Sequence, residues 1–518
     1  MTSRTHLVPQ AVRDPFLLVV AAVSLLTYAL HGIEGMLTRD LAVYSYAGQQ
    51  VAEGVPPYVG ILNRAGPLAH VLPGIGVVTA RAGGFDDLLL MRLEFMLFAV
   101  ACVVAVYLLG RDLSVSRPAG LVTAATFLTF SGFIEYASNG PREKTPMTLF
   151  VVLALWAVAR KRWFTAGLCV SLATLCLQIA FFTSFTAVLA AALLVAQGER
   201  TRALVRIALG GALPVGALAL WFTVAGSLRE SVDAFLLINA RYTTPDPVLP
   251  RLEEEWIELQ AAYGPSVWLL VVGLVALVGL GLTVVSVRAR REQPSTRLLA
   301  AFALAALAGL AWNLKEYDDW PDLFPVLPLA AVGIGGLFAR LTWRLPARIV
   351  YCAAVACSLA MTGVAIHDSV STRDDSLVTQ RASVDAVLDQ LPPDATITSV
   401  EAPQPLVLTG RTNPTRFQMF SAGLQDYMDD TWPGGMDGLR RDIVAGNPDL
   451  IVTGDPVSNR WRNAILTEYV YIGSAPDWAW YARESLGQQK LAALRGAAGF
   501  DPGDELAQLP ETAGAPRS

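Results

Sequence analysis

A few charged residues stand next to long apolar stretches, and one of them, Asp40, has the chemistry of a general base. It lies in the segment 39–47, after an apolar run that is long enough to cross a membrane. An ionisable side chain so close to a membrane span is costly, and its default interpretation is functional. A carboxylate there can accept a proton from an incoming hydroxyl group. Asp40 is therefore our candidate catalytic residue.

Cations from two later polar segments can complete the same site. Arg142 and Lys144 lie in one segment and Lys315 in another, and the whole chain contains only four lysines. Fixed cations bind a phosphate leaving group and stabilise its developing negative charge. Together with a carboxylate base, they indicate sugar transfer from a lipid-linked sugar phosphate. We therefore assign Arg142, Lys144 and Lys315 to the donor phosphate.

Each of these residues also has a purely structural explanation. Asp40 can be the N-cap of a helix over residues 41–52. Arg142 and Lys144 can extend from the start of an apolar run towards water. Lys315 can form an exposed ion pair with a nearby aspartate, which contributes little energy. The catalytic and the structural roles of Asp40 are compatible.

The composition is that of an integral membrane protein with an added polar domain. Hydrophobic residues make up 53% and charged residues 16% of the 518 residues. Apolar runs of roughly the length that a bilayer requires occur eleven times, near 15–32, 88–110, 118–135, 146–160, 163–178, 180–197, 203–224, 265–287, 297–313, 322–340 and 347–366. The shorter run 67–82 is interrupted by Pro73, Gly74 and Gly76, and we expect a surface or re-entrant helix there.

The basic residues predict how these runs cross the membrane. With the run 67–82 excluded, the basic loops near 111–117, 160–162, 200–206, 288–297 and 340–348 all fall on the side of the N-terminus. Under the positive-inside rule this side is the cytoplasm. The outer side receives the loops 32–87, 136–146, 225–264 and 314–321 and the C-terminal domain. The sequence thus predicts a multi-pass protein of the cell membrane whose candidate site residues are extracytoplasmic.

The pattern changes after about His367, where acidic residues begin to outnumber basic ones. Helical spacing at 383–391 and 438–444 alternates with strand-like segments at 396–400 and 449–453. A terminal hairpin is expected over 469–473 and 478–483. We expect a membrane domain over residues 1–366, a small soluble α/β domain over 367–498 and a disordered tail over 499–518.

The order of residues in the first outer loop resembles that of GT-C fold glycosyltransferases. The loop contains Asp40, Tyr44, the motif Glu53-Gly54-x-Pro56-Pro57-Tyr58 and the motif Asn63-Arg64-x-Gly66-Pro67-Leu68, and Arg92 follows at the start of the second span. It is similar to the branch with protein mannosyltransferases, aminoarabinose transferases and archaeal dolichol-phosphate-mannose mannosyltransferases. The resemblance extends to Lys144 and returns at residues 320–325.

This resemblance implies a mainly α membrane protein, with a GT-C-like bundle of about eleven transmembrane helices, surface helices in the first outer loop and a C-terminal α/β domain. It implies an inverting transferase that moves mannose from a polyprenyl or dolichyl phosphate to an extracytoplasmic N-glycan or lipid-linked glycan. The first-loop aspartate is catalytic in that family, and this role carries over to Asp40. The candidates for sugar or acceptor contacts are Tyr44, Tyr58, Arg92, Glu143, Asp318, Asp319 and Trp320.

Two other functions stay open. The first-loop position has one acidic residue and not an adjacent Asp-Glu pair, which disfavours protein O-mannosylation. A secondary transporter or lipid flippase usually has internal repeats, and the sequence shows none. No metal-ligand cluster is evident, so we expect no cofactor and leave a divalent metal open. The expected partners are the bilayer, the lipid-linked sugar and a glycan or glycoprotein acceptor, with no role for nucleic acid.

Overall fold

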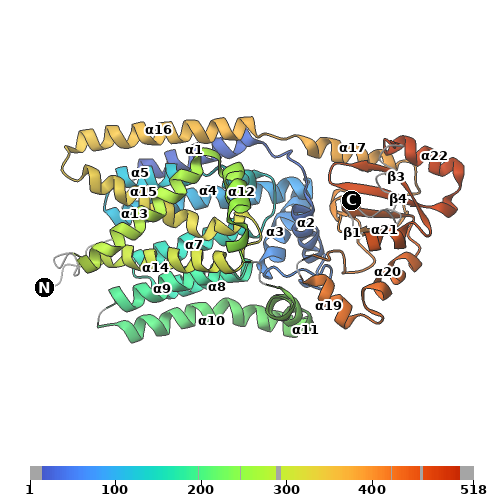
Figure 1. Cartoon of the computed structure of the whole chain (residues 1–518), viewed down its shortest axis with the longest axis horizontal. Helices are drawn as coiled ribbons and strands as arrows, with labels where there is room; N and C mark the ends of the chain where they lie inside the picture. The colour runs from blue at the N-terminus through green and yellow to red at the C-terminus, as the bar shows by residue number, and fades with distance from the viewer. Residues whose placement is uncertain are drawn as a thin grey trace, which may run out of the picture.

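A bundle of long helices and a smaller domain with a sheet lie at opposite ends of the molecule (Figure 1). This computed structural model describes residues 14–196, 198–244, 247–286, 293–421, 423–454 and 459–501. The expected tail beyond Asp501, and Arg288, Arg290 and Arg291 of one basic loop, lie outside these residues. Helix α10 begins, α15 ends and α16 begins at the end of the bundle that is opposite to the C-terminal domain.

The bundle is formed by helices that follow the apolar runs of the sequence. They are α1 (Pro15–His31), α4 (Asp87–Ser114), α5 (Arg117–Leu128), α6 (Ser131–Ser138), α7 (Lys144–Ala159), α8 (Trp163–Cys176), α9 (Ala180–Val195), α10 (Arg200–Val224), α13 (Val267–Ser286), α14 (Pro294–Lys315), α15 (Leu327–Thr342) and α16 (Ala347–Ser371). Short helices connect them: α11 (Leu228–Val232), η2 (Asp233–Tyr242), η3 (Leu249–Arg251), α12 (Leu252–Tyr263), η4 (Gly264–Ser266) and η6 (Trp320–Val326).

The multi-pass membrane architecture is confirmed, but the number of eleven spans is not. Among the described residues, six helices are long and apolar enough to cross a bilayer, and seven if α5 and α6 form one broken span. The four apolar helices α1, α7, α8 and α9 are shorter than this limit. A hydropathy run shows that a segment is buried in an apolar medium, whereas the helix ends depend on local capping and packing.

Helices α5 and α6 meet at an angle of 74°. At this turn, Gly132 lets α6 pack closely against Trp320, because a side chain at this position would collide with the indole ring. The bend directs α6 and the following loop towards the C-terminal domain. It thereby brings Glu135 and Tyr136 to the end of the bundle.

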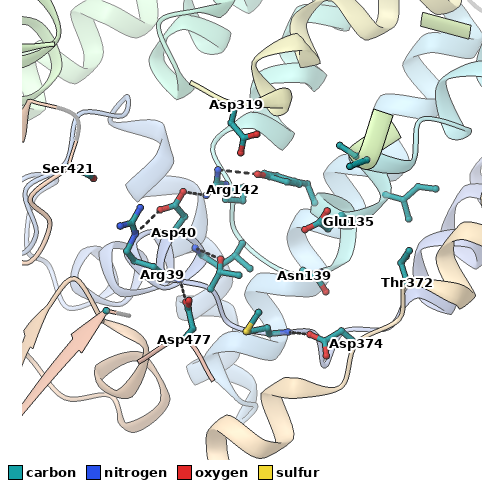
Figure 2. Close-up of a pocket in the computed structure, with 18 of the residues that line it drawn as sticks. Arg39, Asp40, Glu135, Asn139, Arg142, Asp319, Thr372, Asp374, Ser421 and Asp477 are labelled. Atoms are coloured by element: carbon teal, nitrogen blue, oxygen red, sulfur yellow. Dashed lines mark hydrogen bonds and ion pairs between the residues drawn. The ribbon is translucent and has the colours of Figure 1, made fainter. Parts of the chain in front are cut away.

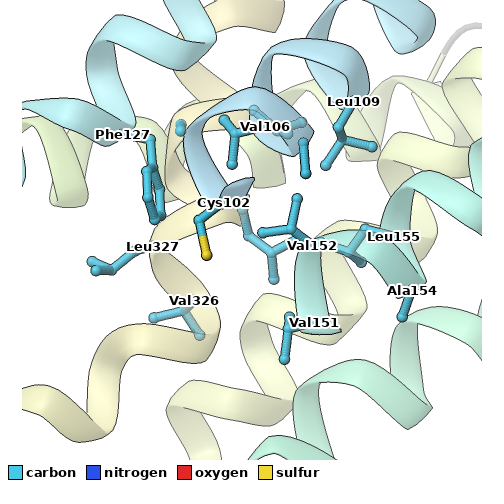
Figure 3. Close-up of a cluster of buried hydrophobic side chains, with 14 of the residues drawn as sticks. Cys102, Val106, Leu109, Phe127, Val151, Val152, Ala154, Leu155, Val326 and Leu327 are labelled. Carbon is cyan, nitrogen blue, oxygen red and sulfur yellow. The ribbon is translucent and has the colours of Figure 1, made fainter. Parts of the chain in front are cut away.

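Close helix packing holds the bundle together. Figure 3 shows apolar side chains of α4, α5 and α7 that interlock around Cys102, Val106, Phe127 and Val152. Within a membrane, helices associate largely through such packing, and small residues at the contact let backbones approach. Gly273 on α13 is one such position, because an added Cβ atom would fall on the carbonyl group of Ala330 on α15.

The first loop contains the two expected surface helices, α2 (Arg39–Ala52) and α3 (Leu68–Gly83). Helix α3 has 16 residues, with Pro73 in its interior, and packs against both α2 and α4. Gly48 permits the close approach of α2, because a Cβ atom there would collide with Pro73. The run 67–82 is thus a helix that packs on the bundle and is not among the candidate spans.

The C-terminal domain has a four-stranded mixed sheet in the order β1-β2-β4-β3. The strands are β1 (Ile397–Val400), β2 (Leu450–Gly454), β3 (Tyr469–Ala475) and β4 (Trp478–Arg483), and the helices are α17 (Ser376–Leu388), α18 (Gln404–Thr409), α19 (Leu424–Thr431), α20 (Gly435–Ala445), α21 (Asn459–Ile465), η7 (Glu484–Leu486) and α22 (Gln488–Ala497). Strands β1 and β2 are parallel, with Ile397 opposite Leu450, whereas β3 and β4 form the expected antiparallel hairpin. The predicted α/β character of this domain is therefore present.

The C-terminal domain is fastened to the first loop by buried polar contacts. The Gln380 side chain accepts a hydrogen bond from the Leu37 amide (2.8 Å) and donates one to the Leu37 carbonyl group (3.1 Å). The Tyr46 hydroxyl accepts a hydrogen bond from the amide of Asn413 (2.9 Å). Apolar side chains of α2 and of the C-terminal domain share one core. The domain is therefore docked on the first loop, from Leu37 to the middle of α2.

A pair of alanine substitutions on α13 tests the packing of the bundle. Gly273→Ala places a methyl group against α15 and should destabilise the fold by about 1–3 kcal/mol through overpacking. Gly279→Ala is the matched control, because no atom lies within 4 Å of the added methyl group. Alanine also favours the helix there by up to about 1 kcal/mol. Thermal unfolding in detergent should separate the two variants, and equal stabilities would contradict the packing described.

Candidate active site

A polar cavity of about 800 Å³ separates the end of the helix bundle from the C-terminal domain. Its walls come from the end of α1, the start of α2, α6 with its following loop, α12 and several segments of the C-terminal domain. Figure 2 shows Asp40 inside this cavity between Arg39 and Arg142, with Asp319 on one side and Asp477 on the other. A cavity of this volume is in the range of small-molecule sites.

Asp40 lies in the first turn of α2 and is not its N-cap. The cap is Thr38, whose hydroxyl group accepts a weak hydrogen bond from the amide of Leu41 at 3.4 Å. The structural explanation of Asp40 as the cap is therefore wrong. The carboxylate still benefits from the positive end of the helix dipole. Its side chain keeps 45% of its surface accessible, so it can meet a ligand in the cavity.

The Arg142 guanidinium is the main partner of Asp40, with Nη1 at 2.5 Å from Oδ2. It also lies 4.9 Å from the ring of Tyr136 and 6.0 Å from that of Tyr44, as expected for cation–π contacts. Burial tends to raise the pKa of Asp40, but the charges of Arg142, Arg39 and Lys144 outweigh this effect and lower the pKa. Asp40 is therefore ionised at neutral pH.

Lys144 forms a second, more deeply buried pair with Asp322. Their charged atoms are 2.8 Å apart, and the two side chains are only 8% and 9% exposed. The other oxygen of Asp322 accepts a hydrogen bond from the amide of Asp318 (3.0 Å), whose carboxylate pairs with Arg64 at 2.5 Å. Since Arg142 and Lys144 are close in the chain, charged groups from the first, second and fourth predicted outer loops form one network.

Lys315 is placed differently from the other predicted cations. Its ammonium group lies 4.9 Å from the ring centre of Trp312, which stacks on Phe182. Lys315 is not among the residues that line the polar cavity. The loop that carries it nevertheless reaches the cavity through Asp319, whose pKa is raised by burial. The fourth predicted outer loop therefore reaches the cavity of Asp40 with a carboxylate and not with Lys315.

Only Asp319 among the predicted sugar or acceptor contacts lines the polar cavity. Asp318 points away into its exposed pair with Arg64. Trp320 packs edge-on against Tyr136 and Tyr263 behind the cavity wall.

The other residues predicted to contact the sugar or the acceptor do not line the polar cavity, and three of them support residues that do. Tyr44 and Glu143 flank Arg142, with a Glu143 carboxylate oxygen 3.7 Å from the guanidinium. The buried Arg92 side chain donates hydrogen bonds to the carbonyl groups of Ile33 and Gly35, and so shapes the loop before α2. Tyr58 donates to the carbonyl group of Ala65 and borders a different, apolar cavity.

Several residues of the cavity escaped the sequence analysis, namely Arg39, Glu135, Glu401 and Asp477. Glu135 carried a usable signal, because it is an ionisable residue at the end of an apolar run. Glu401 follows β1, which is parallel to β2, and the carboxyl ends of parallel strands often carry binding sites. Asp477 gave no signal, since an aspartate in a hairpin turn is common.

The apolar cavity has a volume of about 460 Å³ and lies among α8, α9, α10 and η2. Arg64 is connected to residues of both cavities. Its carbonyl group accepts a hydrogen bond from Gln178 (3.1 Å), which also donates to the carbonyl group of Phe235 in the wall of the apolar cavity. The Arg64 guanidinium pairs with Asp318, the neighbour of Asp319 in the polar cavity. Across the described ranges, no three His, Cys, Asp or Glu side chains are grouped to hold a metal ion.

Comparisons with known proteins reveal similarity only in three dimensions. No protein-family model and no curated protein matches the sequence. The structure is similar to ArnT from Cupriavidus metallidurans bound to undecaprenyl phosphate, with a TM-score of 0.61, 12% identity and coverage of 91% of this chain and 99% of that chain. The apo state of ArnT gives a TM-score of 0.59 at 13% identity, covering 94% of this chain and 99% of that chain.

A third similar structure is the Archaeoglobus fulgidus oligosaccharyltransferase complex with Zn and sulfate. Its TM-score is 0.51 at 13% identity, and the match covers 90% of this chain and 73% of that chain. These neighbours are GT-C fold glycosyltransferases. The present chain is thus a multi-pass membrane protein with the GT-C fold, as the first-loop motifs indicated.

The buried Lys144 and Asp322 pair gives a test of the network. Lys144→Met leaves the Asp322 carboxylate buried without its cation, which should cost about 3–5 kcal/mol of folding free energy. Adding Asp322→Asn removes the unpaired charge and keeps an acceptor for the Asp318 amide, so most of the stability should return. The matched control Asp318→Asn breaks an exposed pair worth about 0–1 kcal/mol. A stable Lys144→Met variant in thermal unfolding would contradict the buried pair.

Proposed function

We propose that the protein is an inverting glycosyltransferase that moves a sugar from a polyprenyl phosphate to an extracytoplasmic glycan. The observation that carries this proposal is the pair of Asp40 and Arg142 inside a polar cavity at the end of a membrane bundle. A base and a fixed cation side by side are the groups that displacement of a phosphate by a hydroxyl requires.

In the proposed reaction, Asp40 accepts the proton of the acceptor hydroxyl group. The hydroxyl oxygen forms a bond to the anomeric carbon of the donor as the bond from this carbon to the phosphate oxygen breaks. One displacement inverts the anomeric configuration. The phosphate leaves with its negative charge, which Arg142 stabilises through the guanidinium N–H groups that do not bind Asp40.

Two observations support the proposal that the sugar donor carries a lipid chain. The similar ArnT structure is bound to undecaprenyl phosphate. In this chain, Arg64 connects the two cavities through bonds, because its carbonyl group shares Gln178 with Phe235 of the apolar cavity and its guanidinium pairs with Asp318 beside Asp319 of the polar cavity. We propose that the isoprenoid chain lies on this apolar side, with the phosphate between Arg142 and the cations Lys144, Arg64 and Lys315. In this proposal, Lys144 loosens its ion pair with Asp322 when the donor binds and then contacts the phosphate.

The identity of the sugar and the orientation in the membrane complete the proposal. Mannose, carried by dolichyl phosphate, and an N-glycan or lipid-linked glycan acceptor follow from the resemblance of the first-loop motifs. Helices α10 and α16 begin at the end of the bundle that is far from the C-terminal domain, and their first turns carry basic residues such as Arg200 and Arg348. We propose a cytoplasmic N-terminus and an extracytoplasmic C-terminal domain, since basic loops stay in the cytoplasm.

The role of Asp40 is tested by sugar transfer in membranes. Asp40→Asn keeps the shape of the side chain and removes its basicity, so transfer should fall by roughly 10²–10⁴-fold, the usual contribution of a general base. The assay measures labelled sugar released from a panel of dolichyl-phosphate and undecaprenyl-phosphate donors.

The matched control for this experiment is Asp385→Asn. Asp385 is an exposed aspartate of α17 that does not line the cavity, and its variant should keep wild-type transfer. Wild-type turnover by Asp40→Asn would remove the assigned base. Absence of transfer by the wild-type protein with every donor would contradict the proposed function itself.

A further inference from the structure

Arg39 connects the C-terminal domain to the N-terminal end of α2. Its Nη1 atom lies 2.9 Å from the carboxylate of Glu401, and its backbone amide donates a 2.7 Å hydrogen bond to Asp477. The same side chain places Nε at 3.5 Å from Oδ1 of Asp40. One arginine thus contacts two carboxylates of the C-terminal domain and the proposed base, and all four residues line the polar cavity.

The C-terminal domain holds both of these carboxylates in place. The second oxygen of Glu401 accepts a 2.6 Å hydrogen bond from the amide of Phe420. Oδ2 of Asp477 accepts a further 2.7 Å bond from the Gln404 side chain. Each carboxylate therefore has one partner within its own domain and one on Arg39.

The backbone at both positions is unusual for residues with a side chain. Glu401 has φ of 64° and Asp477 has φ of 76°, both in the left-handed region. Asp tolerates this region better than Glu, and such conformations persist only where the surroundings hold them. Gly454, at the end of β2, allows the chain to pass Glu401, because a Cβ atom there would press on the Glu401 carbonyl oxygen. The geometry at the end of β1 therefore presents the Glu401 carboxylate to Arg39.

The two oxygens of Asp40 have different surroundings as a result. Oδ2 is bound by Arg142, whereas Oδ1 accepts no hydrogen bond in the described part of the chain and has only the 3.5 Å approach of Arg39. Glu401 competes for the same guanidinium, because it binds Nη1 of Arg39 at 2.9 Å. Without this competition, Arg39 can turn fully onto Asp40 and occupy Oδ1.

We propose that Glu401 and Asp477 are positioning residues that hold Arg39 away from Oδ1 of Asp40, so that Oδ1 can accept the proton of the acceptor hydroxyl. The inference rests on the proposed function, and it makes docking of the C-terminal domain a requirement for the chemical step. Asp477 fixes the backbone of Arg39, and Glu401 holds its side chain.

The kinetic test uses Glu401→Gln, which keeps the shape of the side chain and weakens its attraction for Arg39. We expect kcat to fall roughly 10- to 100-fold, as for other groups that orient a reactive residue. KM for the donor should stay within about twofold, since Arg142 and the lipid contacts are unchanged. Adding Arg39→Gln should restore most of kcat, because nothing then occupies Oδ1. The matched control is Arg381→Gln, which breaks a 3.0 Å interdomain pair with Asp86 outside the cavity.

Two results would overturn the inference. One is a wild-type kcat in Glu401→Gln, and the other is a double variant with Arg39→Gln that is no faster than Glu401→Gln alone. An equal loss of kcat in Arg381→Gln would also overturn it, because weakened docking at any point would then explain the effect.

Hydrogen exchange tests the same contacts without any activity. Asp477→Ala removes the acceptor of the Arg39 amide, so a peptide over residues 36–42 should exchange faster than in the wild type and in Arg381→Gln. A wild-type protein without transfer would overturn the proposed function, whereas unchanged exchange in Asp477→Ala would overturn the contact between the domain and α2.

Discussion

The ion pair of Asp40 and Arg142 joins the first loop to the segment that follows the bent helices α5 and α6. Arg142 needs an anionic partner because its side chain is only 11% exposed, and Asp40 supplies this partner from the wall of the cavity. The pair also keeps Asp40 ionised, since nearby cations lower its pKa against the effect of burial. The geometry of the site therefore depends on this interaction.

Much of the surrounding structure supports this pair. Arg92 shapes the loop before α2 through two carbonyl groups, and Thr38 caps the helix that presents Asp40. Tyr136 faces the Arg142 guanidinium, and Trp320 packs behind Tyr136. From the other side, the C-terminal domain reaches Arg39 with two carboxylates. The cavity is thus built at a junction, and neither the membrane bundle nor the C-terminal domain contains the whole of it.

The sequence was most informative where a residue type conflicted with its neighbours. Asp40 and Arg142 stand out because charges beside apolar runs are costly, and α2, β2 and the hairpin of β3 and β4 follow from simple periodicity. The same reasoning favours Lys315, yet Asp319 faces the cavity, because the direction of each side chain in this loop is set by the turn into η6. Pattern alone does not determine that direction.

Other parts of the structure depend on information that no local pattern carries. Glu401 and Asp477 are ordinary acidic residues of an acidic domain until the sheet forms and docks on α2. The number of spans also could not be derived, because the equally long apolar runs 15–32 and 118–135 became one helix of 17 residues in α1 and a helix of 12 residues in α5 that is followed by the separate helix α6. Tertiary packing decides where each helix stops.

The most direct measurement is an experimental structure of the protein with a bound polyprenyl phosphate. The proposed function predicts that the phosphate lies within hydrogen-bonding distance of the Arg142 guanidinium, with Asp40 facing the space where the sugar would begin. A phosphate held elsewhere, with the cavity around Asp40 unchanged and out of its reach, would contradict the central claim that this ion pair is the catalytic centre.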